Sequence, residues 1–92
     1  MQDGNGPNRK PHSRGRPEYV LSRLDPRLRI TSHAGDILFL VSRGSKAREV
    51  GSALGITCDT VYEEIESLRK RLGARNMADL IRLAIRHGFV AP

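Results

Sequence analysis

Hydrophobic residues recur at helical spacing through the last two-thirds of the chain, and a glycine follows each of these segments. The four glycines are Gly44, Gly55, Gly73 and Gly88. A glycine just after a helix commonly takes the left-handed conformation that ends the helix. The pattern therefore predicts four helices, and since no segment shows strand-like alternation, we expect an all-α fold.

The first two predicted helices cover about residues 32–43 and 46–54. Thr31 is the expected N-cap of the first helix, because its hydroxyl oxygen can accept a hydrogen bond from an early backbone amide. The residues predicted to face inward are Ile37, Leu38, Leu40 and Val41 in the first helix and Ala47, Val50 and Leu54 in the second.

The third predicted helix starts after Thr57, and the fourth runs from an Asn76 cap to about residue 87. One apolar stripe of the third helix is formed by Val61, Ile65, Leu68 and Leu72. The fourth helix has one stripe that should face the core, Leu80, Leu83 and Ala84, and a second stripe of Ala78, Ile81, Arg82 and Ile85.

The first 28 residues lack this helical pattern. Residues 1–17 contain no apolar residue after Met1 and are rich in Gly, Pro, Asn, Arg and Lys. Such a segment buries too little surface to offset the entropy of ordering it, so we expect a flexible, disordered basic arm. Residues 18–28 are expected to form a linker or a short helix that ends before Pro26. The predicted domain is 29–92.

Charge and composition narrow the class of protein. The chain has 16 Lys and Arg against 10 Asp and Glu, a formal net charge of +6 that favours a polyanionic partner. It has no long apolar run and no secretory signal, and its single cysteine, Cys58, fits a cytoplasmic protein. Its three histidines lack metal-ligand spacing and no set of catalytic groups is evident, so we expect neither an enzyme nor a cofactor.

The segment Gly55-Ile56-Thr57 lies between the second and third predicted helices. The glycine permits a tight turn, the isoleucine can fill the core, and the threonine caps the next helix. These features are typical of a helix-turn-helix motif, which presents its second helix to the major groove of DNA. In this chain that helix would be the third.

The sequence from Ile30 to Val90 resembles, without a gap, the DNA-binding domain of LuxR-type (FixJ/NarL-type) regulators. Leu54-Gly55-Ile56-Thr57 is similar to the family's Leu-x-Ile-Ser, and Arg48-Glu49-Val50-Gly51 to its Lys-Glu-Ile-Ala. The other matching positions are Ile37-Leu38, Gly44, Thr60-Val61, Leu68, Arg71-Leu72-Gly73, Asn76, Leu80 and Ala84. The resemblance implies a compact four-helix LuxR-type helix-turn-helix domain that binds DNA with its third helix.

The same resemblance implies contacts at particular positions. Arg48 and Thr60 would contact phosphates. Tyr62, Glu63 and Glu66 would face the bases. The full set expected on the DNA side of the domain is Arg48, Thr60, Tyr62, Glu63, Glu66 and Lys70. The second stripe of the fourth helix, Ala78, Ile81, Arg82 and Ile85, corresponds to the surface through which family members dimerise, with extra core as the alternative.

The third helix departs from the family pattern because it is acidic. Family members usually carry a lysine, often followed by an apolar residue and a histidine, where this chain has Tyr62, Glu63 and Glu64. Three interpretations remain open. The acids could stabilise the helix start, with Glu66 paired to Lys70; one or two glutamates could accept hydrogen bonds from cytosine N4; or the helix no longer binds the groove.

Within the basic arm, Arg14-Gly15-Arg16-Pro17 resembles the core of an AT-hook. The resemblance implies that Arg14 and Arg16 enter the narrow minor groove of A·T-rich DNA. The alternative is a solubilising basic tail that attracts phosphates without sequence preference.

Our first hypothesis is a stand-alone, sequence-specific DNA-binding transcriptional regulator, homodimeric on double-stranded DNA in the bacterial cytoplasm, at the nucleoid. We expect no receiver or ligand-binding domain before it and no membrane partner. The second hypothesis is an interaction module that keeps the fold but binds protein, as an anti-activator or heterodimer partner of another LuxR-type regulator. The acidic third helix supports the second hypothesis.

Overall fold

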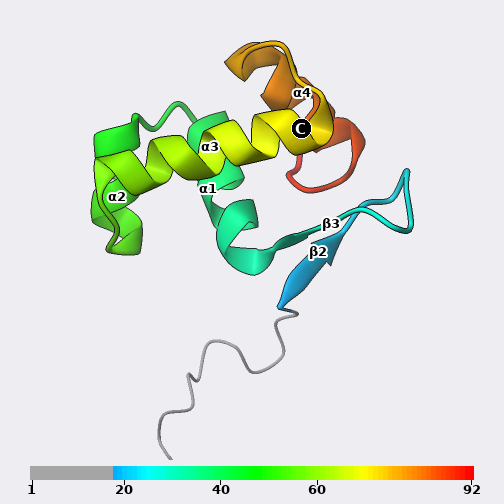
Figure 1. Ribbon diagram of the computed structural model, residues 1–92, viewed down its shortest axis with the longest axis horizontal. Coiled ribbons are helices and arrows are strands. Elements are labelled where there is room, and N and C mark those ends of the chain that lie inside the picture. Colours follow the sequence, from blue (N-terminus) through cyan, green and yellow to red (C-terminus); the bar gives the residue numbers. More distant parts are fainter. Residues whose placement is uncertain (1–17) are drawn as a thin grey trace, which may run out of the picture.

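The computed structural model describes residues 18–92, which form four helices and a two-stranded antiparallel sheet (Figure 1). The strands are β2 (Tyr19–Leu21) and β3 (Arg29–Thr31). The helices are α1 (Ser32–Ser42), α2 (Ala47–Leu54), α3 (Cys58–Leu72) and α4 (Met77–Arg86). The prediction of a compact four-helix domain is confirmed, and the molecule is mostly helical.

The β2–β3 hairpin corrects the sequence-based interpretation of residues 18–28. A short helix was one expectation there, whereas Tyr19–Leu21 is a strand with Val20 opposite Ile30 of β3. Each strand has three residues, of which only the central one faces inward. Three residues are too few to show an alternating pattern, and the pairing itself depends on packing against the helices.

The helix ends follow the predicted capping pattern. The side-chain oxygens of Thr31, Thr57 and Asn76 each accept a backbone N–H three residues later, at 3.0, 3.1 and 2.9 Å. All four glycines predicted to end helices have positive φ. Helix α2 begins differently, because the Glu49 carboxylate accepts the backbone N–H of Lys46 at 2.8 Å while the lysine side chain offers no acceptor.

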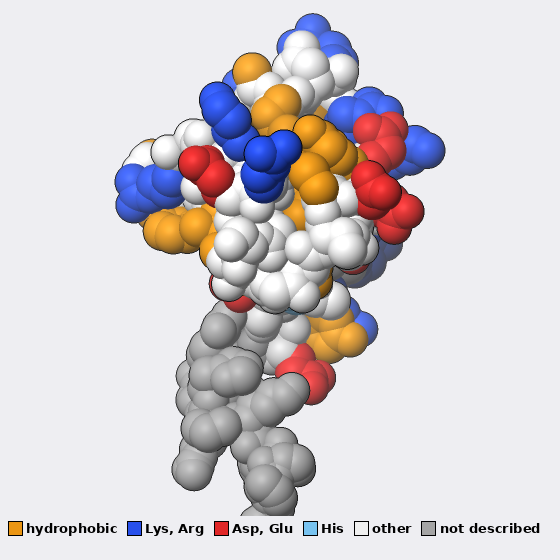
Figure 2. Space-filling view, turned by 90° about the vertical axis from the view of Figure 1, so that its left-hand side faces the viewer, with side chains coloured by type: hydrophobic (Ala, Val, Ile, Leu, Met, Phe, Trp, Pro, Cys, Tyr) orange, Lys and Arg blue, Asp and Glu red, His pale blue; other side chains and the backbone are white. Residues whose placement is uncertain are grey.

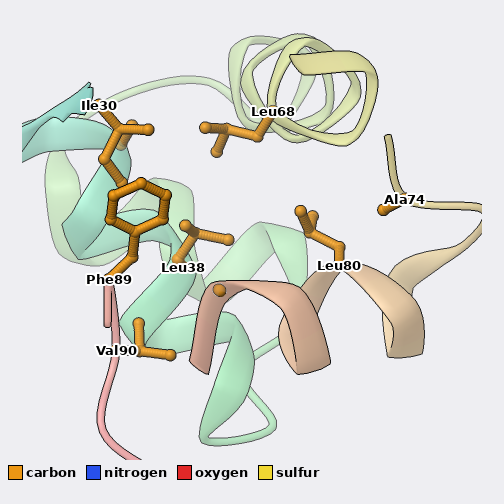
Figure 3. Close-up of a cluster of buried hydrophobic side chains, with 9 residues drawn as sticks. Ile30, Leu38, Leu68, Ala74, Leu80, Phe89 and Val90 are labelled. Atoms are coloured by element: carbon orange, nitrogen blue, oxygen red, sulfur yellow. The ribbon is translucent and has the colours of Figure 1, made fainter. Parts of the chain in front are cut away.

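The larger hydrophobic cluster joins α1, α3, α4, β3 and the segment after α4. Leu38, Leu68 and Leu80 point toward one another in Figure 3, one from each of three helices. Partly buried residues of the hairpin pack against the same cluster, so the hairpin is part of the folded unit. The buried members are Ile30, Ala34, Leu38, Leu68, Ala74, Leu80, Ala84, Phe89 and Val90.

A second, smaller cluster joins α1, α2 and α3. Its members Ile37, Val50 and Val61 are fully buried. Ile56, from the turn between α2 and α3, packs against this cluster, and Ile65 of α3 packs against both clusters. Helix α3 is therefore anchored along most of its length, which fixes its orientation relative to α2.

Hydrogen bonds join the β2–β3 loop to the end of α4. The Ser22 hydroxyl lies 2.7 Å from Nδ1 of His87 and accepts the backbone N–H groups of Leu24 and Asp25, both at 3.0 Å. The backbone N–H of Arg23 donates to the His87 carbonyl at 2.8 Å. Because both lone pairs of the Ser22 oxygen receive amides, its hydrogen is left to donate to His87.

Candidate nucleic-acid interface

The turn Gly55-Ile56-Thr57 sets the geometry between α2 and α3. Gly55 has φ 73°, in the left-handed region, and the N–H of Ile56 donates to the Gly51 carbonyl at 3.0 Å. A Cβ atom on Gly51 would lie 2.6 Å from the carbonyl oxygen of Ile56, so α2 and the turn are in close contact. This is the arrangement of a helix-turn-helix motif, with α3 as its second helix.

Helix α3 is buried along one face and exposed along the other. Val61 and Leu68 lie in the core, whereas Tyr62, on the opposite face, is 60% exposed. Side chains three or four residues apart share a helix face, so the exposed residues form one surface. Four residues predicted to lie on the DNA side are among them: Tyr62, Glu63, Glu66 and Lys70.

The two residues predicted to contact phosphates lie on the two helices of the motif. Arg48 is exposed on α2 and forms no hydrogen bond or ion pair with any residue in the range 18–92. Thr60 is half-buried in the first turn of α3, where its Oγ1 accepts the hydroxyl of Thr57 at 2.9 Å. The hydrogen of the Thr60 hydroxyl thus stays available for another acceptor.

Glu66 is paired with Arg69, and the interpretation that it pairs with Lys70 is wrong. The Arg69 guanidinium donates to both carboxylate oxygens of Glu66, at 3.1 and 2.6 Å, and also to the Ala74 carbonyl at 2.8 Å. Hydrogen bonding to Arg69 lowers the pKa of the Glu66 carboxyl, and the same bond raises the pKa of Arg69. The forked guanidinium can bridge a carboxylate and a carbonyl, which an ammonium does less well.

Charges of both signs surround the start of α3. Figure 2 shows the end of the molecule formed by α2 and the beginning of α3, where acidic and basic side chains are interspersed with hydrophobic ones. Within residues 18–92, Asp59, Glu63 and Glu64 form no hydrogen bond or ion pair through their carboxylates. The helix therefore exposes carboxylates whose charge nothing in the described part of the chain neutralises.

The stripe on α4, defined above by Ala78, Ile81, Arg82 and Ile85, is partly accessible. Ala78 and Arg82 are exposed, while Ile81 and Ile85 are half-buried, and Ile85 also packs against the larger core cluster. Met77 is 40% exposed and was missed by the sequence analysis. Its position four residues before Ile81 places it on the same face, so helical spacing could have found it.

Asp79 is a buried carboxylate next to this stripe. It is 6% exposed, and it accepts the backbone N–H of Arg75 at 3.0 Å and two N–H groups of the Arg82 side chain at 3.0 and 2.7 Å. The hydrogen bonds from the Arg75 backbone and from Arg82 lower the pKa of Asp79 to about 2. Asp79 therefore holds Arg82 in one position on the α4 stripe.

Some of the predicted features lie outside residues 18–92. Arg14, Arg16 and the AT-hook-like segment lie outside the described residues. Among residues 18–92, no helix has the length and apolar character needed to cross a membrane. In the same range, no three His, Cys, Asp or Glu side chains are grouped so that they could hold a metal ion.

Comparison with known proteins gives two relatives. The chain is 39% identical to the transcriptional regulatory protein MctR of Rhizobium johnstonii over an alignment of 74 residues. This alignment covers 80% of the chain and 33% of MctR. It is 34% identical to the transcriptional activator protein BjaR1 of Bradyrhizobium diazoefficiens over 67 residues. This second alignment covers 73% of the chain and 28% of BjaR1. The chain thus spans about a third of the length of these relatives. No family profile matches it.

A solved structure, of VqmA bound to DPO, has the same fold. The TM-score is 0.60 and the sequence identity is 33%, over 65% of this chain and 30% of the VqmA chain. The curated relatives are transcriptional regulators rather than enzymes. The C-terminal region of this chain is therefore homologous to LuxR-family transcriptional regulators, and its four helices form a LuxR-type helix-turn-helix domain.

Proposed function

We propose that this protein is a sequence-specific DNA-binding transcriptional regulator that places α3 in the major groove of double-stranded DNA. The observation that carries the proposal is the exposed face of α3, which follows a tight turn from α2 and is backed by two core clusters. A rigidly held helix with one free face is what major-groove binding requires. The homology to transcriptional regulators supports the same conclusion.

In this proposal the contacts divide into two kinds. Arg48 and Thr60 bind phosphates, for which an unpaired guanidinium and a free hydroxyl hydrogen are suitable donors. The exposed face of α3 reads base edges, and the folded unit of residues 29–92, extended by the β2 strand, is the DNA-binding domain. Tyr62 and Glu63 face the base edges, whereas Glu66, held by Arg69, and Lys70 lie on the same DNA-facing surface of α3.

We further propose that two copies bind DNA together through the α4 stripe, extended by Met77. A two-fold pair would place the two α3 helices on half-sites about one helical turn of DNA apart. The half-exposed apolar residues of α4 and the fixed position of Arg82 support this assignment.

The proposal is tested by selecting bound sequences from random DNA with the full chain and then measuring affinity as a function of salt. We expect saturable, sequence-selective binding that Arg48→Ala weakens, with the slope of log affinity against log salt reduced by about 1. The matched control is Arg27→Ala, which removes the same charge from a side chain that is 92% exposed in the β2–β3 loop. Equal effects of the two variants would contradict the assignment of Arg48.

The AT-hook-like segment is tested in the same assay with Arg14→Ala/Arg16→Ala in the full chain. We expect this variant to lose preference for A·T-rich flanking DNA while it keeps the sequence preference contributed by α3. If it loses all binding, the assignment of α3 to the major groove is wrong.

The second candidate function is an interaction module that binds another LuxR-type regulator through α4. The observation in its favour is the set of unpaired carboxylates at the start of α3, which phosphates would repel. On this candidate the full chain binds DNA only as strongly as its basic arm does. Arg14→Ala/Arg16→Ala therefore weakens this binding strongly, while Arg48→Ala changes nothing.

A further inference from the structure

Glu63 and Glu66 lie on the same exposed face of α3 but have different partners. Glu66 accepts two hydrogen bonds from Arg69, at 3.1 and 2.6 Å, whereas Glu63 has no partner within residues 18–92. From the sequence alone, these two glutamates are equivalent candidates for base contacts. The structure distinguishes them.

The carboxylate of Glu66 is already committed within the protein. Arg69, which binds it, also donates to the Ala74 carbonyl at 2.8 Å, just after the end of α3. Turning Glu66 toward a base would break both of its hydrogen bonds to Arg69, the residue that anchors the α3–α4 connection. Its negative charge is, in addition, offset by the guanidinium at contact distance.

The carboxylate of Glu63 has no such partner near it. Residues that share its helix face at three or four positions away are Asp59, Thr60, Glu66 and Ser67, none of which is basic. The charged residues at this spacing, Asp59 and Glu66, are both acidic, and neither can pair with the Glu63 carboxylate. In a groove lined by phosphates, this carboxylate is tolerated only where a donor on the DNA faces it.

The base edges in the major groove offer few such donors. Cytosine presents the N4 amino group, and adenine presents N6 beside the acceptor N7. Guanine and thymine present acceptors, O6 and N7 or O4, which repel a carboxylate. Since N7 also repels a carboxylate that approaches adenine N6, cytosine is the base that an unpaired glutamate favours.

We infer that Glu63 is the specificity-determining acceptor of α3 and selects a cytosine in each half-site through its N4 amino group. Glu66 is a positioning residue that holds Arg69 against the α3–α4 connection. This inference rests on the proposed function, because it assigns the base read by the helix proposed to enter the major groove.

The test is selection of bound sequences with three full-length proteins: the unsubstituted chain, Glu63→Gln and Glu66→Gln. Both substitutions remove one negative charge from an exposed position and keep the side-chain shape, so each is a matched control for the other. A glutamine binds adenine N6 and N7 together. We expect Glu63→Gln to exchange cytosine for adenine at one position of each half-site, with cytosine disfavoured by about ten-fold or more relative to the unsubstituted chain.

Glu66→Gln is expected to leave the base preference unchanged at every position. The inference is overturned if Glu63→Gln selects the same sequence as the unsubstituted chain, or if Glu66→Gln is the variant that changes the preferred base. Either result is compatible with the proposed function, provided that Arg48→Ala still weakens binding. If the unsubstituted chain selects no sequence at all, the proposed function fails, and this inference with it.

Discussion

At the scale of single residues, polar side chains with several partners set the detailed geometry of this small domain. Thr57 and Gly55 have the cap and turn conformations that the sequence predicts, because each depends only on neighbours within one helical turn. The partner of Glu66 could not be predicted in this way. Arg69 and Lys70 are both within reach along the helix, and the carbonyl of Ala74, placed by the folded α3–α4 connection, favours Arg69.

Asp79 gives a prediction at this scale. Its pKa of about 2 in the folded protein lies below its ordinary value of 3.8, so the folded state favours the ionised form. The stabilising contribution is complete above pH 3.8 and is lost as the pH falls to about 2, because the unfolded chain takes up the proton first. In urea unfolding, Asp79→Asn is expected to be less stable than the unsubstituted chain near neutral pH and to lose less stability over this acid range.

The control for Asp79 is Asp25→Asn in the β2–β3 loop. The Asp25 carboxylate is half exposed, lies 3.9 Å from the Arg27 side chain and accepts the backbone N–H of Arg27 at 3.0 Å, so its loss should cost less stability near neutral pH than the loss of Asp79. The same acid dependence in the unsubstituted chain and in Asp79→Asn would contradict the prediction.

At the scale of elements, length decides what the sequence can predict. Helices of 8 to 15 residues show enough turns for their apolar faces to be read, and all four were found, with ends within about two residues. The β2–β3 hairpin was not found, because its three-residue strands have no readable period. What holds it in place is long-range: Val20 packs near Gly35 of α1, and the loop is hydrogen-bonded to the end of α4.

Ser22 gives the prediction for this joint between elements. Ser22→Ala removes the hydrogen bond to His87 and leaves the backbone N–H groups of Leu24 and Asp25 without their acceptor. We expect the free energy of unfolding to fall by about 1–3 kcal/mol, measured by chemical denaturation. Ser42→Ala, which removes a single hydroxyl donor to the Phe39 carbonyl at the end of α1, should change it by less than about 0.5 kcal/mol. A loss below about 0.5 kcal/mol for Ser22→Ala would contradict the assignment of stability to this joint.

At the scale of the whole molecule, the helix-turn-helix arrangement and the family were predicted from the sequence, because the turn residues and caps are local features. The role of α4 was predicted only from the family resemblance. A half-exposed helix face can either add to the core of its own chain or pack against a second copy. The contacts within a single chain do not decide between these two roles.

A prediction at this scale concerns pairing on DNA. Ala78→Arg places a bulky cation on an exposed position of the α4 stripe, the surface proposed to pack against a second copy. We expect the variant to bind a two-fold site as single copies, with apparent affinity about ten-fold lower or more, and to unfold within about 0.5 kcal/mol of the unsubstituted chain. Stoichiometry by analytical ultracentrifugation of the protein–DNA complex is the measurement.

His33→Arg is the control for Ala78→Arg, since it adds a cation at an exposed position on α1. It should leave two copies bound to each duplex. If Ala78→Arg also binds as two copies with unchanged affinity, the α4 stripe is not the pairing surface.

The joint between Ser22 and His87 also bears on how the domain is made. The bonded residues are 65 positions apart in the chain, and Phe89 and Val90 complete the larger core cluster beside Ile30. The hairpin emerges from the ribosome well before these core residues. Helices α2 and α3 can form local contacts as they emerge, but the core around β3 stays open until residues 87–90 have left the exit tunnel. Folding of the domain is therefore completed only after residues 87–90 have emerged.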